Sequence, residues 1–147
     1  MDLTSEEKEG LRDLLAKLRE IAEDFSHAYL SRLQLLVPER RLRAFTSVLD
    51  GGELLLLSLA EIVALLDEPE QLAAKPVLGE NHLPKDSPAE NYDLKVECCF
   101  WAAEHCLGDA FTPQARSGLR KVSTFRRAAF LSQRAGGAAA SATAGRA

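Results

Sequence analysis

ELLLLSLAEIVALL, residues 53–66, is apolar on nearly every side when it is drawn as a helix. A helix of this length that carries apolar residues all round is buried between other helices. We therefore expect this stretch to form the centre of the fold. Ser58 and Glu61 interrupt the run, which is shorter than the roughly 18 apolar residues of a membrane span.

Helical patterning continues on the N-terminal side of this stretch. Thr4-Ser5-Glu6-Glu7 has the form of a capping box, and apolar residues then recur at helical spacing. A second apolar series covers residues 25–36 and stops before Pro38, with at most a bend between the two helices. A short segment follows at residues 39–49, and we expect a turn at Asp50-Gly51-Gly52.

The C-terminal side predicts three more elements. A brief segment at residues 71–82 is followed by a proline-containing loop and by a long helix over residues 91–107, which Gly108 ends. Thr112-Pro113 has the N-cap and first-turn proline that begin a last helix. β-branched residues are few and no segment alternates for long with period two, so the class is all-α.

The last helix has an apolar stripe and many basic residues. The stripe is expected to point inward and comprises Ala115, Gly118 or Leu119, Val122, Phe125 and Ala129. The basic residues are expected on its solvated outer face and include Arg116, Arg120, Lys121, Arg126, Arg127 and Arg134.

Length and charge indicate one domain over residues 1–134. Residues 135–147 are rich in alanine and glycine and predict a flexible tail, although the alanines would also let the last helix continue. The net charge of −4 hides an asymmetry, because all 22 acidic residues precede residue 110. The strongly acidic body argues against a nucleic-acid binder.

Cysteines and the N-terminal residues indicate the compartment. The chain has an odd number of cysteines, all within one short stretch: Cys98, Cys99 and Cys106. Their spacing matches neither a disulfide framework nor a zinc motif. We expect free thiols packed on or beside a helix, with redox sensing as the alternative. The first residues lack the basic and apolar regions of a signal peptide. We therefore expect a cytoplasmic protein without a membrane partner.

Two motifs point to a known family. His82 ends the segment Leu78-Gly79-Glu80-Asn81-His82, Tyr92 follows ten residues later, and Leu107-Gly108-Asp109-Ala110-Phe111-Thr112-Pro113 leads into the last helix. In this order the motifs resemble the globin family, in particular bacterial single-domain globins, the globin domain of flavohaemoglobins and neuroglobin-like proteins. The resemblance covers roughly residues 4–131 and implies a globin fold of six to eight helices around a haem pocket.

The resemblance implies that His82 is the proximal ligand of the iron of haem b. A neutral imidazole donates one nitrogen lone pair to iron while its other nitrogen forms a hydrogen bond. Taken alone, His82 would be a surface or capping histidine. Residues 38–45, PERRLRAF, look like the family's Pro-x-x-Arg-x-x-Phe segment with one extra residue, so that Phe45 would stack on the porphyrin unless it is an ordinary core aromatic.

Apolar side chains are expected to line the haem slot. With Phe45 and His82, the expected cofactor contacts are Leu54, Leu55, Leu59, Val63, Leu78, Tyr92, Val96 and Phe100.

The expected distal side of the haem lacks the usual polar residue. The position that holds a distal His or Gln in the family falls within residues 51–55, which contain neither; Leu54 or Leu55 is expected there, or Glu53 if the helix is rotated. Tyr29 or Leu30 is expected to complete the distal pocket. A tyrosine hydroxyl would stabilise dioxygen by hydrogen bonding, whereas an all-leucine pocket would favour carbon monoxide or nitric oxide.

The proximal side also departs from the family's oxidative members. Tyr92 matches their proximal tyrosine by spacing, but no glutamate follows Glu104 to complete the relay with His82. We therefore expect gas binding rather than catalysis. Nitric oxide dioxygenase-type activity would need an external reductase, because the chain has no flavin or nicotinamide domain.

The sequence thus predicts a haem-binding globin that reversibly binds O2, NO or CO for oxygen transport, scavenging or sensing, as a monomer or homodimer. One alternative is a globin-fold interaction or signalling module without haem, which the unusual distal helix favours. Another is an unrelated helical bundle in which Leu-Gly-x-x-His occurs by chance.

Overall fold

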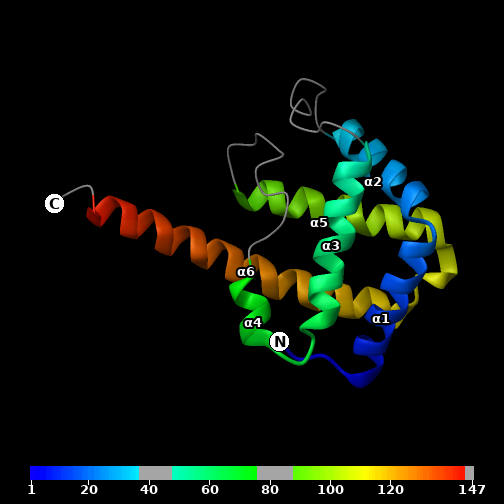
Figure 1. The fold of residues 1–147 in the computed structure, drawn as a ribbon, viewed down its shortest axis with the longest axis horizontal. Coiled ribbons are helices and arrows are strands. Elements are labelled where there is room, and N and C mark those ends of the chain that lie inside the picture. Colours follow the sequence, from blue (N-terminus) through cyan, green and yellow to red (C-terminus); the bar gives the residue numbers. More distant parts are fainter. Residues whose placement is uncertain (37–47, 76–87, 145–147) are drawn as a thin grey trace.

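The computed structural model describes residues 1–36, 48–75 and 88–144. Phe45, Leu78 and His82 lie outside these ranges. The elements, in chain order, are α1 (Ser5–Glu20), α2 (Ala22–Leu36), α3 (Val48–Ala64), α4 (Pro69–Ala74), α5 (Pro88–Leu107), the 3-10 turn η3 (Gly108–Ala110) and α6 (Pro113–Ala144). No strand occurs in these ranges, so the described chain is all-α as predicted; in Figure 1, α3 runs at a steep angle to α5 and α6.

The first helix begins at the predicted capping box, and only a short break separates it from the second, as the sequence predicts. The Glu7 backbone N–H donates to the Thr4 hydroxyl at 3.1 Å, and the Thr4 N–H donates to Glu7 Oε1 at 2.9 Å. This reciprocal capping box satisfies two backbone donors that a helix start leaves unpaired. Ile21 alone separates α1 from α2.

The predicted turn at Asp50-Gly51-Gly52 is wrong, because α3 already begins at Val48. Two glycines inside a helix cost about 1 kcal/mol each relative to alanine. The long apolar run that follows packs against α1 and α2, and this packing outweighs the local preference. The central helix is therefore longer than its apolar residues indicate.

The connection between α5 and α6 follows the predicted signals. Gly108 ends α5 with φ of 53°, a conformation that glycine adopts without steric cost. The hydroxyl of Thr112 accepts a hydrogen bond from the Ala115 N–H at 3.2 Å and so caps α6, which starts at Pro113. The helix runs to Ala144, through most of the alanine- and glycine-rich segment.

Helices α1 and α6 approach each other most closely at two glycines. A Cβ atom on Gly10 would lie 2.8 Å from the Ala115 backbone nitrogen, and one on Gly118 would lie 3.0 Å from the Glu7 carbonyl oxygen. Both distances are shorter than ordinary van der Waals contact. Hydrogen atoms at these positions therefore permit the crossing.

Glu7 joins the same two helices by polar contacts. Its carboxylate accepts hydrogen bonds from the Ser117 hydroxyl at 2.5 Å and from Lys121 Nζ at 2.9 Å. These bonds, with the capping contact, lower the pKa of Glu7 from its ordinary 4.5 to about 2. A buried carboxylate is thus fully partnered at the α1–α6 contact.

The core lies where α2 packs on both α3 and α5, and where α1 and α4 pack on α6. Its largest fully buried side chains are Phe25, Leu11, Leu14, Leu18, Leu33, Leu72, Val122 and Cys98. In the part of the chain that the structure describes, no helix is both long and apolar enough to cross a membrane.

Candidate functional site

The central helix α3 carries two adjacent faces with different roles. Leu55, Leu59 and Ile62 recur at helical spacing, and Leu66 continues the spacing just after α3 ends. The last three are buried in the core shared with α1 and α2. Leu54, Ser58 and Glu61 follow the same i, i+4, i+7 spacing one position earlier. These three residues form the second face of α3.

Arg126 shows that the second face of α3 is turned toward α6. Its Nη1 donates a hydrogen bond to Ser58 Oγ at 2.9 Å, and the arginine is only 4% exposed. The prediction that Arg126 lies on the solvated side of the last helix is therefore wrong. Arg120 and Lys121, by contrast, are exposed as predicted.

The burial of Arg126 follows from its position on the helix. Between residues 123 and 133, the buried positions of α6 are Arg126 and Phe130, whereas the predicted inward residues Phe125 and Ala129 are only half-buried. The stripe continues in phase with Leu119 and Val122 at the usual four- and three-residue steps. Arg126 occupies an in-phase position and is therefore buried despite its charge.

A second charged group lies near Arg126. Glu61 Oε2 is buried and has no hydrogen-bond partner among the described residues. Burial lowers the pKa of the Arg126 guanidinium, while nearby Tyr92 and Glu61 act in the opposite direction. We name Ser58, Glu61 and Arg126 the buried polar cluster, in which Arg126 is buried and Ser58 and Glu61 are half-buried. The sequence singled out none of them as a site residue.

Tyr92 of α5 contacts α6 through a hydrogen bond and a ring stack. Its hydroxyl donates to the Ser123 backbone carbonyl at 3.0 Å, and its ring stacks on Phe130 with 5.8 Å between centroids. Burial raises the pKa of Tyr92 to about 12, so the phenol stays protonated at neutral pH. In the described structure the hydroxyl proton is thus directed to the backbone of α6.

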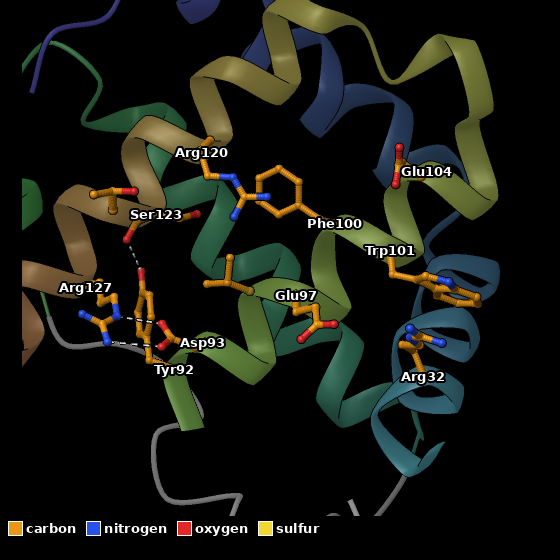
Figure 2. A pocket seen from close by; sticks show the side chains of 12 residues that line it. Arg32, Tyr92, Asp93, Glu97, Phe100, Trp101, Glu104, Arg120, Ser123 and Arg127 are labelled. Atoms are coloured by element: carbon orange, nitrogen blue, oxygen red, sulfur yellow. Dashed lines mark hydrogen bonds and ion pairs between the residues drawn. The ribbon is translucent and has the colours of Figure 1, made fainter. Parts of the chain in front are cut away.

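Tyr92, Val96 and Phe100 also line a groove of about 380 Å³ formed by α2, α5 and α6 (Figure 2). The Arg120 guanidinium lies 3.9 Å from the centroid of the Phe100 ring, and the Arg127 guanidinium pairs with Asp93. The structure therefore brings these three predicted cofactor contacts together at a charged groove. The predicted contacts Leu54, Leu55, Leu59 and Val63 lie instead along α3.

The remaining predicted positions are partly described. Tyr29 and Leu30 are both buried on α2. Burial raises the pKa of Tyr29, and the thiols of Cys98 and Cys99 add to this effect. Phe45, Leu78 and His82, which include the predicted iron ligand, lie outside the described residues.

The three cysteines are free thiols, as predicted, with Cys98 buried and Cys99 and Cys106 half-buried. Burial raises the pKa of both Cys98 and Cys99 to about 12. Within the ranges that the structure covers, no group of three or more His, Cys, Asp or Glu residues is placed to hold a metal ion.

Comparison with known proteins does not assign a family. No protein-family model matches the chain, and no curated protein is significantly similar to it.

Proposed function

We propose that this chain is a haem-binding globin that reversibly binds a diatomic gas, O2, NO or CO. His82 is the proposed iron ligand, on the resemblance of Leu78-Gly79-Glu80-Asn81-His82 to the proximal segment of globins. Haem b, when bound, supplies the iron at which a gas binds. The protein is proposed to bind gas rather than to act as an enzyme, with an external reductase as partner for any turnover of nitric oxide.

The single observation that carries the proposal is the pairing of the helices. α2 packs on both α3 and α5, while α1 and α4 pack on α6. Globins pack their helices pairwise at crossing angles around the haem pocket. The short α4 ends just before the segment that contains His82, which suits a proximal ligand carried between α4 and α5.

In this proposal, a leucine of α3 covers one face of the porphyrin. Leu54, Leu55 and Leu56 are half-buried and Leu57 is 56% exposed, so four successive leucines retain apolar surface that the described residues do not cover. Leu54 shares its face with Ser58, which meets α6, and Leu55 shares its face with the core. This difference supports Leu54 as the distal residue.

A leucine at the distal position has a chemical consequence. Its side chain excludes water and donates no hydrogen bond. We therefore expect weaker discrimination in favour of dioxygen than a distal His or Gln provides, a difference of about 1–3 kcal/mol per hydrogen bond in a dry pocket.

The test is haem titration of the full chain followed by absorption spectroscopy. We expect stoichiometric binding with a Soret band, and His82→Ala to lose the band or shift it markedly. His27→Ala is the matched control, because His27 is exposed on α2. Absence of a Soret band in the unmodified chain refutes haem binding; an unchanged band in His82→Ala shows that another residue holds the iron.

A second candidate function, a globin-fold interaction or signalling module without haem, is favoured by the buried polar cluster. A charged arginine in the interior suits an apolar cofactor poorly. For this candidate we expect a cooperatively folded chain whose thermal midpoint is unchanged by haem, since a ligand of the folded state raises that midpoint.

A further inference from the structure

We propose that the groove formed by α2, α5 and α6 binds a small zwitterionic molecule with two carboxylates and one ammonium group, an acidic amino acid. The groove encloses about 380 Å³, near the lower end of the range of small-molecule sites, which is about 300–1,000 Å³. The inference goes beyond the proposed gas binding, because it depends on charged side chains of the groove and on no bound haem.

Two of the carboxylates that line the groove are already neutralised by arginines of α6. The Arg127 Nε lies 2.7 Å from Asp93 Oδ1, and the Arg116 Nη1 lies 2.6 Å from Glu104 Oε1. A paired carboxylate offers little to a charged ligand, because its attraction is already spent on its partner. The charges available for recognition are therefore those that lack such a partner.

Three charged side chains of the groove make no ion pair within the described parts of the chain: Arg32, Arg120 and Glu97. The Arg32 Nε is also buried without a hydrogen-bond partner among these residues. Two cations and one anion are complementary to a ligand with two anionic groups and one cationic group. An acidic amino acid carries this set of charges at neutral pH.

Aromatic rings hold both arginines in place while leaving their hydrogen-bond donors available. The Arg120 guanidinium lies 3.9 Å from the centroid of the Phe100 ring, and the Arg32 guanidinium lies 5.3 Å from that of the Trp101 ring. A guanidinium stacked on a ring uses its flat face, so the N–H groups along its edge can still bind a carboxylate bidentately. The ring contact also lowers the entropy that the side chain loses on binding.

Glu97 is placed to meet the ammonium group. Phe100 and Trp101 follow it by three and four residues on α5, a spacing at which helix side chains are neighbours. In Figure 2, Glu97 lies between the side chains of Arg120 and Arg32. An ammonium group at this exposed carboxylate would leave the two carboxylates of the ligand to the arginines on either side. A dicarboxylate without an amine would instead be repelled by Glu97.

The experiment titrates the full, haem-free chain with L-glutamate and, separately, with glutarate, which has the same two carboxylates but no ammonium group. Trp101 is the only tryptophan, so its fluorescence reports directly on the groove; calorimetry is the second readout. We expect L-glutamate to bind about tenfold more tightly than glutarate. Glu97→Gln should abolish or reverse this preference, whereas a merely structural role of Glu97 would weaken both probes alike.

The arginine variants test the other half of the site. Arg120→Gln and Arg32→Gln should each raise the dissociation constant of L-glutamate about tenfold, measured by calorimetry because Arg32→Gln also alters the surroundings of Trp101. Arg19→Gln is the matched control, since Arg19 is exposed on α1, and it should leave the constant unchanged.

The outcomes separate this inference from the proposed gas binding. A preference for L-glutamate that depends on Glu97, with losses in both groove arginine variants only, supports the site. No saturable binding of L-glutamate, equal affinity for the two probes, or an equal loss in Arg19→Gln overturns it. Because the titration contains no haem, absence of a Soret band leaves the site standing, and absence of L-glutamate binding leaves the haem proposal standing.

Discussion

Gly10→Ala is expected to destabilise the protein by forcing α1 and α6 apart. The new Cβ would lie 2.8 Å from the Ala115 nitrogen and 3.1 Å from the Ala115 Cα and the Gln114 carbonyl carbon. All three atoms belong to the backbone of the first turn of α6. No side chain can rotate away, so α1 itself must move.

The magnitude follows from two opposing effects. Forcing an extra methyl group into a well-packed contact costs about 1–3 kcal/mol, and the upper part of that range, about 2–3 kcal/mol, applies here because the three close atoms are backbone atoms that cannot rotate away. Alanine in place of glycine inside a helix returns about 1 kcal/mol. The net loss in the free energy of unfolding is therefore about 1–2 kcal/mol, which for a protein near 150 residues lowers the thermal midpoint by about 2–8 °C.

The assay is urea and thermal unfolding followed by far-ultraviolet circular dichroism. Glu9→Ala is the control, since Glu9 is exposed beside Gly10, and its effect should stay within about 0.5 kcal/mol. Gly118→Ala should be intermediate, because the flexible Leu11 side chain supplies two of its three close contacts. A Gly10→Ala protein as stable as the unmodified one, or more stable, would show that α1 and α6 do not approach this closely.

Two further predictions concern titrating groups. The folded-state pKa of Glu7 lies near 2, below its ordinary 4.5, so its contribution to stability is complete above about pH 4.5 and is lost as the pH falls toward 2. The stability of Glu7→Gln should therefore depend less on pH in this window than that of the unmodified chain. Equal pH dependence of the two proteins would contradict the lowered pKa. The Cys98 and Cys99 thiols, with pKa values near 12 rather than 9, should hold about a thousandfold less thiolate than an ordinary cysteine. Native protein should therefore react with a thiol reagent at neutral pH much more slowly at both residues than denatured protein, in which all three cysteines are accessible. Rapid native labelling of Cys98 would refute its burial.

Signals that act within one helical turn were predictable from the sequence. The Thr4–Glu7 capping box, Gly108 at the end of α5 and the Thr112-Pro113 start of α6 all appear where local chemistry places them. Each depends on hydrogen bonds between residues at most a few positions apart. The all-helical class follows from the same local patterns.

The start of α3 could not be predicted in this way. Asp50-Gly51-Gly52 is a turn signal by composition, and only the packing of α3 against α2 and α1 makes it helical. Tertiary contacts of this kind join residues far apart in the chain. A local reading therefore begins this helix too late, at residue 53 instead of residue 48.

In the buried polar cluster, the helical spacing of apolar residues indicates burial of Arg126, whereas its charge alone would place it on the surface. Leu119, Val122 and Phe130 establish the phase of the inward stripe of α6, and Arg126 falls in that phase. Burial follows the phase of a helix, since its apolar anchors fix which side faces the core. A charged residue in phase must then be buried with partners, and one partner of Arg126 is Ser58 of α3, which lies 68 positions earlier in the chain. The two polar interruptions of the apolar run at residues 53–66 were the complementary signal, because Ser58 and Glu61 are spaced to meet a side chain from the same direction. An in-phase charge on one helix and paired polar interruptions on another together predict a buried polar site that neither pattern predicts alone.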